Sequence, residues 1–136
     1  FKSRYEADER YHEINLGRWT FRGGWRIYSS GPGIYIGLVV STLLGIRTEA
    51  EKLILDPVMP ISFNGLSASL KLLGYNVRIH YRITRDCCGP ESIRLNGKKI
   101  LFEREENQYR KGGAAVIIKS MLDLMQSSGN SLEIEM

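Results

Sequence analysis

Alternation of apolar and polar residues is the main pattern over the C-terminal two thirds of the chain. From Val77 to Ile83 every second residue is apolar, and Arg78, His80 and Arg82 lie between them. A period of two is typical of a β-strand with one buried face, so we expect a strand over residues 76–84. Strands are also predicted at residues 53–55, 67–73, 92–95, 98–102, 114–119 and 132–136.

Turn residues separate these strands at regular intervals. Asn96-Gly97 is the preferred dipeptide of a two-residue hairpin, and Gly74-Tyr75 marks a second hairpin. About seven short strands at this spacing are typical of an antiparallel β-sandwich, which we expect over roughly residues 52–136. The segment from Met121 to Met125 is ambiguous between helix and strand.

An apolar helix is predicted before the strands, over residues 32–44. Pro32 suits a first helical turn, Ser30 is the expected N-cap, and Gly45 is expected to end the helix. The segment is apolar on nearly every face, which implies burial on most of them. Since a chain of 136 residues offers too little other sequence to cover such a helix, we expect a partner domain.

Composition and charge exclude some classes of partner. The chain has 43% hydrophobic and 25% charged residues, as in a globular domain, and a net charge of +4 from 19 basic and 15 acidic residues. Because the charges are mixed along the chain, we expect no nucleic-acid partner. The apolar run at residues 33–46 is shorter than the ~20 residues that span a bilayer, so we expect no membrane insertion.

The cysteines and the first residue bear on cellular context. Cys87 and Cys88 are adjacent, which fits neither a disulfide nor a zinc site. We therefore expect two free thiols in a cytoplasmic protein and no metal site. Because the first residue is Phe1 rather than Met, we also expect a fragment or a processed product.

A run of small residues, Ser29-Ser30-Gly31-Pro32-Gly33, precedes the apolar helix. The first N–H groups of a helix have no intrahelical acceptor, and the helix dipole adds positive potential there. Glycines and hydroxyl residues at such a point suit phosphate or another anion. The alternative interpretation is a capped helix start without a ligand.

Two motifs beyond this turn carry a family resemblance. Leu44-Gly45-Ile46-Arg47 ends the predicted helix, and Asp56-Pro57-Val58-Met59-Pro60 follows the first strand. With the turn before the helix, residues 17–66 resemble the inverting β-glucoside phosphorylases of glycoside hydrolase family 94. That family carries Thr-Gly-Ser-Ala at the turn, and its Thr-Gly pair falls on Ser29 and Ser30 here.

The resemblance implies a fold and an activity. Residues 1–47 would end an (α/α)6 catalytic barrel, the apolar helix being its last helix, and residues 48–136 would form a C-terminal β-sandwich. The parent enzyme would phosphorolyse β-glucosides reversibly, with inorganic phosphate attacking the anomeric carbon to give α-glucose 1-phosphate. The general acid lies upstream in that family, so the fragment alone is expected to be inactive.

The resemblance also implies a phosphate site. The hydroxyl of Ser29 and the backbone N–H of Ser30 take the places of the family's Thr-Gly pair. Serine lacks the backbone freedom of glycine at residue 30, and Gly31 is expected to restore it.

Three residues of the preceding arm are candidate substrate contacts. Arg22 and Arg26 would supply positive charge, and Trp25 would stack on a sugar ring. The alternatives are surface arginines that pair with acids and a tryptophan that packs against the barrel.

The expected partners are the upstream barrel and an oligosaccharide, with inorganic phosphate as a substrate rather than a cofactor. The alternative function is a non-catalytic sandwich that binds carbohydrate or buttresses another domain. Cyclic β-1,2-glucan synthases, which carry a phosphorylase-like end, are an example. We further expect the uncovered helix to drive self-association, as in a homodimer, or to be covered by the N-terminal arm.

Overall fold

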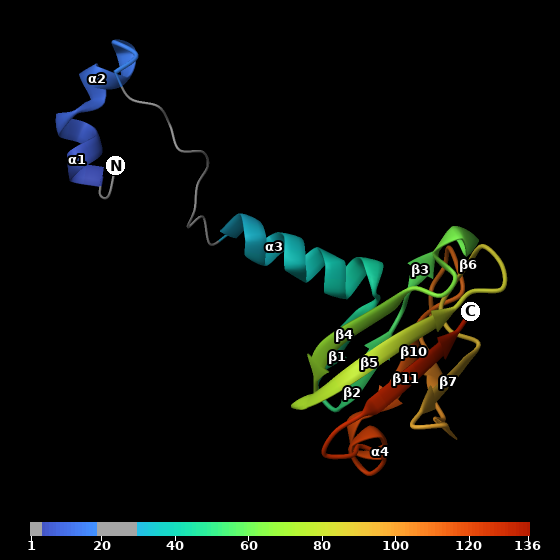
Figure 1. The fold of residues 1–136 in the computed structure, drawn as a ribbon. Coiled ribbons are helices and arrows are strands. Elements are labelled where there is room, and N and C mark those ends of the chain that lie inside the picture. The colour runs from blue at the N-terminus through green and yellow to red at the C-terminus, as the bar shows by residue number, and fades with distance from the viewer. Residues whose placement is uncertain (1–3, 19–29) are drawn as a thin grey trace. The chain divides into compact units, whose positions relative to one another are not determined.

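A computed structural model of the chain describes residues 4–18 and 30–136 (Figure 1). It divides into two compact units, residues 1–32 and 33–136. The first unit contains two short helices, α1 (Arg4–Glu9) and α2 (Tyr11–Asn15). Arg10, between them, forms ion pairs with Glu6 and Glu13.

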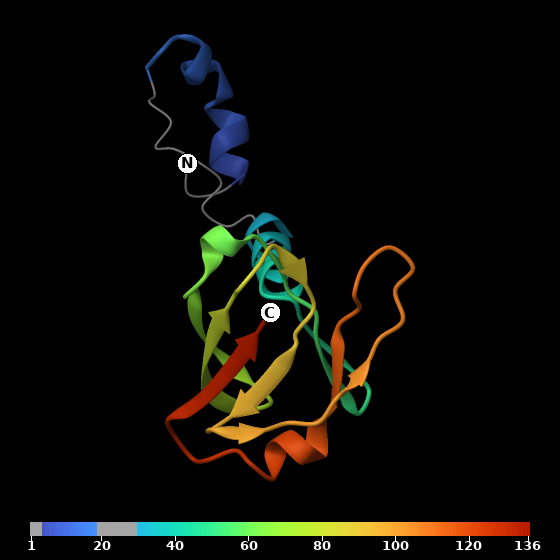
Figure 2. The same ribbon diagram turned by 90° about the vertical axis from the view of Figure 1, so that its right-hand side faces the viewer.

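The second unit is a β-sandwich, as predicted (Figures 1 and 2). One sheet is antiparallel, in the order β1 (Ile46–Glu49), β2 (Lys52–Leu55), β10 (Ala114–Ile117) and β9 (Glu103–Arg104). The other has the order β4 (Ser67–Leu72), β5 (Tyr75–Arg82), β11 (Asn130–Glu135), β7 (Ser92–Leu95) and β8 (Lys98–Lys99). A separate ladder pairs β3 (Val58–Met59) with β6 (Cys87–Cys88).

The second sheet departs in one respect from the antiparallel expectation. Strands β5 and β11 run parallel, whereas the other pairs of that sheet are antiparallel. A parallel pair needs a long crossover connection, and here the chain between the two strands contains β7, β10 and the short helix α4 (Ile118–Leu122). The sandwich is therefore closed by contacts between distant parts of the sequence.

The core is formed by the inward-facing residues that period two predicts. In β5, Val77, Ile79 and Tyr81 are buried, whereas Arg78 and His80 are exposed. Strands β7 and β11 of the same sheet and β2 of the facing sheet contribute aliphatic side chains that are fully buried, among them Leu53, Leu55, Ile93, Leu95, Leu132 and Ile134.

The predicted apolar helix is present but has no cover in the part of the chain that the structure describes. It consists of α3 (Ser30–Leu38) and a π-helical turn, η1 (Val39–Leu43). Side chains on several faces of α3 are exposed, including Ile34 at 63% and Tyr35 at 69%. No helix among the described residues is long and apolar enough to span a membrane.

The predicted residue that ends this helix is correct, whereas the predicted residue that caps its start is not. Gly45 ends it as predicted, with a φ of +66°, and β1 begins at the next residue. The prediction of Ser30 as the N-cap is wrong, because the structure places this residue inside the helix as its first helical residue. The residue that would cap it, Ser29, lies outside the described residues.

Two predicted segments have different structures from those expected. The strand predicted at residues 114–119 ends at Ile117, and α4 occupies the following residues, so the ambiguous segment near Met121 is helical at its start. Met121 is buried and its neighbour Leu122 is exposed, which fits one helical turn lying on the sandwich. The hairpin strand expected at residues 98–102 is only two residues long, β8.

Tyr81 connects the core to the end of the apolar helix. Tyr81 is 1% exposed, and its hydroxyl donates a 2.7 Å hydrogen bond to the carbonyl oxygen of Leu44. Burial raises the pKa of this phenol above its ordinary value. The neutral form is therefore favoured by the folded state.

This raised pKa predicts a loss of stability in alkali. Above about pH 10 the unfolded chain loses the Tyr81 proton while the folded chain retains it, so the free energy of unfolding falls by up to about 1.4 kcal/mol per pH unit. Tyr81→Phe should remove that slope, at a cost of about 1–2 kcal/mol at pH 7 for the lost hydrogen bond. Urea unfolding of both proteins from pH 7 to 11 measures this, and equal slopes would contradict it.

Candidate functional site

The predicted phosphate site falls at the edge of the described structure. Ser30 and Gly31 lie in the first turn of α3, where backbone N–H groups lack helical acceptors. Ser29, Arg22, Trp25 and Arg26 lie outside the described residues. Of the predicted site residues, the structure therefore places only Ser30 and Gly31. Whether they lie near the other four is not described.

The end of the same helix leads into a tightly packed junction. The Asp56 N–H donates a 2.7 Å hydrogen bond to the Gly45 carbonyl oxygen. A Cβ added to Gly45 would lie 2.3 Å from the backbone of Asp56 and of Pro57. The two motifs that carry the family resemblance thus meet in space, because the β1–β2 hairpin folds one onto the other.

An ion pair with a buried carboxylate lies at this junction. Asp56 is 8% exposed, and Arg110 donates to both of its carboxylate oxygens, at 2.6 and 2.7 Å. Arg47 lies 3.4 Å from the same carboxylate and 3.3 Å from Glu105. The hydrogen bond to Asp56 is the main cause that raises the pKa of Arg110.

This pairing favours a structural role for Asp56 over acid–base chemistry. Both of its oxygens accept from the Arg110 guanidinium, and the carboxylate is largely shielded from solvent. Among the residues that the structure describes, no group of histidine, cysteine and acidic side chains could hold a metal ion. Sequence reasoning missed this pair, since its partners are 54 residues apart and Arg110 follows no strand pattern.

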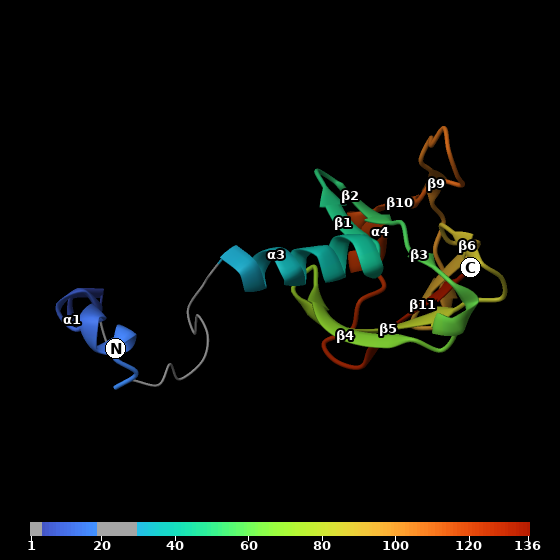
Figure 3. The ribbon, with the colours of Figure 1, turned by 90° about the horizontal axis from the view of Figure 1, so that it is seen from above.

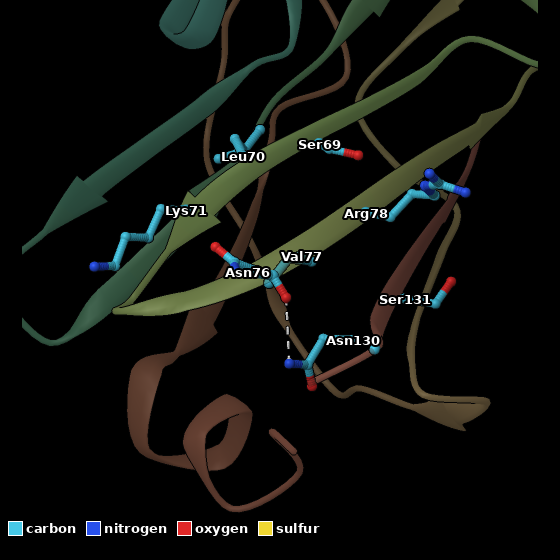
Figure 4. A pocket seen from close by; sticks show the side chains of 9 residues that line it. Ser69, Leu70, Lys71, Asn76, Val77, Arg78, Asn130 and Ser131 are labelled. Atoms are coloured by element: carbon cyan, nitrogen blue, oxygen red, sulfur yellow. Dashed lines mark hydrogen bonds between the residues drawn. The ribbon is translucent and has the colours of Figure 1, made fainter. Parts of the chain in front are cut away.

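A second polar feature lies on the outer face of the larger sheet. Ser69, Arg78 and Ser131 occupy one row across β4, β5 and β11, beside an open hollow of about 510 Å³ (Figure 4). Lys71 and Asn76 form the neighbouring row. None of the described residues that line the hollow carries a carboxylate. Its chemistry suits an anion, but the alternation of a solvent-facing strand also explains these residues.

Asn130 borders this hollow and has a structural role. It is 3% exposed, and its amide group donates to the carbonyl oxygens of Asn76 and Gln126 while accepting from the Gln126 N–H. Figure 4 shows its bond to the Asn76 backbone. With every polar atom engaged, Asn130 fixes the start of β11 beside β5.

Comparisons with known proteins cover the sequence of the sandwich and of the junction. The sequence model described as "Glycoside phosphorylase C-terminal domain" matches residues 45–134. A 1,2-beta-oligoglucan phosphorylase of Listeria innocua is 36% identical over 121 residues, which are 89% of this chain and 11% of that protein. A cyclic beta-(1,2)-glucan synthase of Rhizobium meliloti is 35% identical over 72 residues, which are 53% of this chain and 2% of that protein. The chain thus spans a small part of each relative.

Proposed function

The chain belongs to the glycoside phosphorylase C-terminal domain family, and from this premise we propose that it is the C-terminal end of an enzyme that phosphorolyses β-glucosides reversibly. The similarity to the Listeria phosphorylase carries the proposal. It covers 121 of 136 residues, so it necessarily includes α3 and the Gly45–Asp56 junction in addition to most of the sandwich. The product would be α-glucose 1-phosphate, formed by attack of inorganic phosphate on the anomeric carbon.

In this proposal the chain contributes phosphate binding rather than proton transfer. The first-turn N–H groups of α3 point out of the helix start without intrahelical acceptors, and the helix dipole favours an anion there. Ser29 would donate its hydroxyl and Ser30 its N–H to a phosphate oxygen. The general acid would come from the part of the protein that precedes this chain.

The exposed face of α3 supports a second part of the proposal. Ile34, Tyr35, Ile36 and Leu38 are each more than half exposed, although all four are apolar or aromatic. A preceding helical catalytic domain would cover them, and the longer protein would bind the oligosaccharide. The sandwich would then hold the end of that domain in place through the Gly45–Asp56 junction.

The direct test of activity is phosphate release by the longer protein, meaning the parent enzyme of which this chain would be the C-terminal end. Each reaction would contain α-glucose 1-phosphate as donor and one acceptor, which is glucose, cellobiose or sophorose. Release of inorganic phosphate that depends on one acceptor would establish a phosphorylase and its linkage. The absence of turnover with every acceptor, and with other sugar phosphates, would overturn the proposal.

Replacing Ser29 with alanine tests the phosphate site. Loss of a hydrogen bond to a charged group costs about 1.5–3 kcal/mol, so the KM for inorganic phosphate should rise about tenfold or more in phosphorolysis. Ser41→Ala is the matched control, since that hydroxyl bonds to the Gly37 carbonyl oxygen within the helix. An unchanged KM for phosphate in Ser29→Ala would mean that this turn only starts the helix and does not bind phosphate.

A second candidate function is the non-catalytic end of a glucan synthase. The 35% identity over 72 residues with the Rhizobium synthase favours it. In that case the sandwich would brace a neighbouring domain, and the acceptor assay would show no phosphate release.

A further inference from the structure

The loop between β9 and β10, residues 105–113, projects from the sandwich (Figures 2 and 3). It connects neighbouring antiparallel strands that a much shorter turn would join. Its sequence, Glu-Glu-Asn-Gln-Tyr-Arg-Lys-Gly-Gly, contains one aromatic residue and no aliphatic one.

The base of this loop is held firmly against the sandwich. Arg110 is the residue that pairs with the buried carboxylate of Asp56. Arg104 donates to the carbonyl oxygens of Gly112 and Pro90, at 3.0 and 2.7 Å. A Cβ on Gly112 would overlap the backbone of Glu105, so the two sides of the loop touch at the base. A loop fixed in this way presents its tip in a defined position.

The tip presents one aromatic ring to solvent. The Asn107 side-chain oxygen accepts hydrogen bonds from the N–H groups of Tyr109 and Arg110, at 3.0 and 3.2 Å. This turn leaves Tyr109 93% exposed. Ordering an exposed aromatic residue gains nothing for the isolated sandwich, so a ligand is the simplest reason for the arrangement.

The polar groups that remain available define the chemistry of that ligand. Arg110 and Lys111 pair with Asp56 and Glu91, and Glu105 pairs with Arg47. Within the described residues, the side chains of Glu106, Gln108 and Tyr109 have no such partner. The first two line an open hollow of about 510 Å³ together with Arg104, Arg110 and Lys111, and Tyr109 is next to its lining residues rather than one of them.

A carboxylate, an amide and an aromatic ring suit a neutral sugar. The carboxylate and the amide can bond to hydroxyl groups, and the ring can stack on the C–H face of a pyranose. Glu106 would repel a phosphate, and each neighbouring cation is already engaged: Arg110 by Asp56, Lys111 by Glu91, and Arg104 by two carbonyl oxygens. We propose that loop 105–113 is an accessory binding site for a neutral oligosaccharide, with Tyr109 stacking on a sugar ring; the choice of a glucan rests on the proposed function.

The test is a titration of the ¹⁵N-labelled full chain with a β-1,2-linked gluco-oligosaccharide. Saturable amide shifts should be confined to the loop and its base, and Tyr109→Ala should raise the dissociation constant about tenfold. Tyr5→Ala is the matched control, because Tyr5 is also a solvent-exposed tyrosine, 70% exposed in α1. Absence of shifts, or shifts that Tyr109→Ala leaves unchanged, would overturn the proposal.

A second measurement uses the longer protein and needs no turnover. In native electrophoresis through a gel that contains β-1,2-glucan, Tyr109→Ala should be retarded less than the wild type and Tyr5→Ala equally. Equal retardation of all three proteins would contradict oligosaccharide binding by loop 105–113. Because neither measurement depends on phosphate release, failure of the phosphorylase proposal and failure of this one are separate results.

Discussion

Replacing Arg110 with methionine is expected to lower the free energy of unfolding by about 3 kcal/mol. The change removes the guanidinium that donates to both oxygens of Asp56, a carboxylate that is only 8% exposed. Arg47, at 3.4 Å and more exposed, cannot replace a bidentate partner. The large cost arises because the buried charge stays behind without its partner, and chemical denaturation at pH 7 measures it.

Lys111→Met is the matched control for this prediction. Lys111 is the next residue and also pairs with an acid, but its partner Glu91 is 42% exposed, so water screens the pair. We expect a cost below about 1 kcal/mol. If Arg110→Met were as mild as Lys111→Met, then Asp56 would be reached by water and the loop base would not be fixed by this pair.

Replacing Gly45 with alanine is expected to cost about 2–5 kcal/mol in the free energy of unfolding. Two effects add at this position. The φ of +66° disfavours any residue with a Cβ, and that Cβ would lie 2.3 Å from the backbone of Asp56 and Pro57. Since backbone cannot move aside as a side chain can, the junction between η1 and the sandwich must open.

Gly97→Ala separates the two effects. Gly97 also has a positive φ, +78°, but nothing lies within 4 Å of an added Cβ. This variant should therefore show the conformational cost alone, about 1–2 kcal/mol. Equal losses for the two variants in thermal or urea unfolding would mean that the close approach at Gly45 has no energetic weight.

The local signals in the sequence predict local structure well. Alternation from Val77 to Ile83 identifies the correct inward face of β5, and Asn96-Gly97 identifies the turn between β7 and β8. The hairpin expected around Gly74-Tyr75 is present, but its turn lies one residue earlier: Leu73 and Gly74 have positive φ, and Tyr75 already pairs with Leu72. Each of these depends on neighbouring residues alone, which is why a single sequence suffices.

Strand β1 is an element that these local signals do not predict. The sequence pattern predicts no strand from Ile46 to Glu49, because the turn to β2 contains Ala50 and Glu51 rather than glycine or asparagine. Ala50 nevertheless adopts a φ of +45°. The hairpin is favoured by burial of Ile46 and Leu55 in the core, and such tertiary effects leave no mark on the turn sequence.

The candidate sites also include features that are visible in the local sequence and features that only the folded structure shows. The helix start at Ser30 is visible in the sequence because small residues before an apolar run are a local pattern, and the motifs around Gly45 and Asp56 carry the family resemblance. Their contact with each other, and the pairing of Asp56 with Arg110, connect positions that only the folded sandwich brings together. Loop 105–113 is therefore not predicted, although its single tyrosine among polar residues is a signal that could have indicated it.

Amide hydrogen exchange over residues 30–44 tests most directly whether this module is completed by a preceding domain. In the chain alone, α3 is exposed on several faces and should exchange quickly, whereas β2 and β11 should be protected. In the longer protein the same α3 amides should slow by about a hundredfold or more, with β2 and β11 little changed. Equally fast exchange of α3 in both proteins would contradict a covered helix and, with it, the proposed seam between a catalytic body and this sandwich.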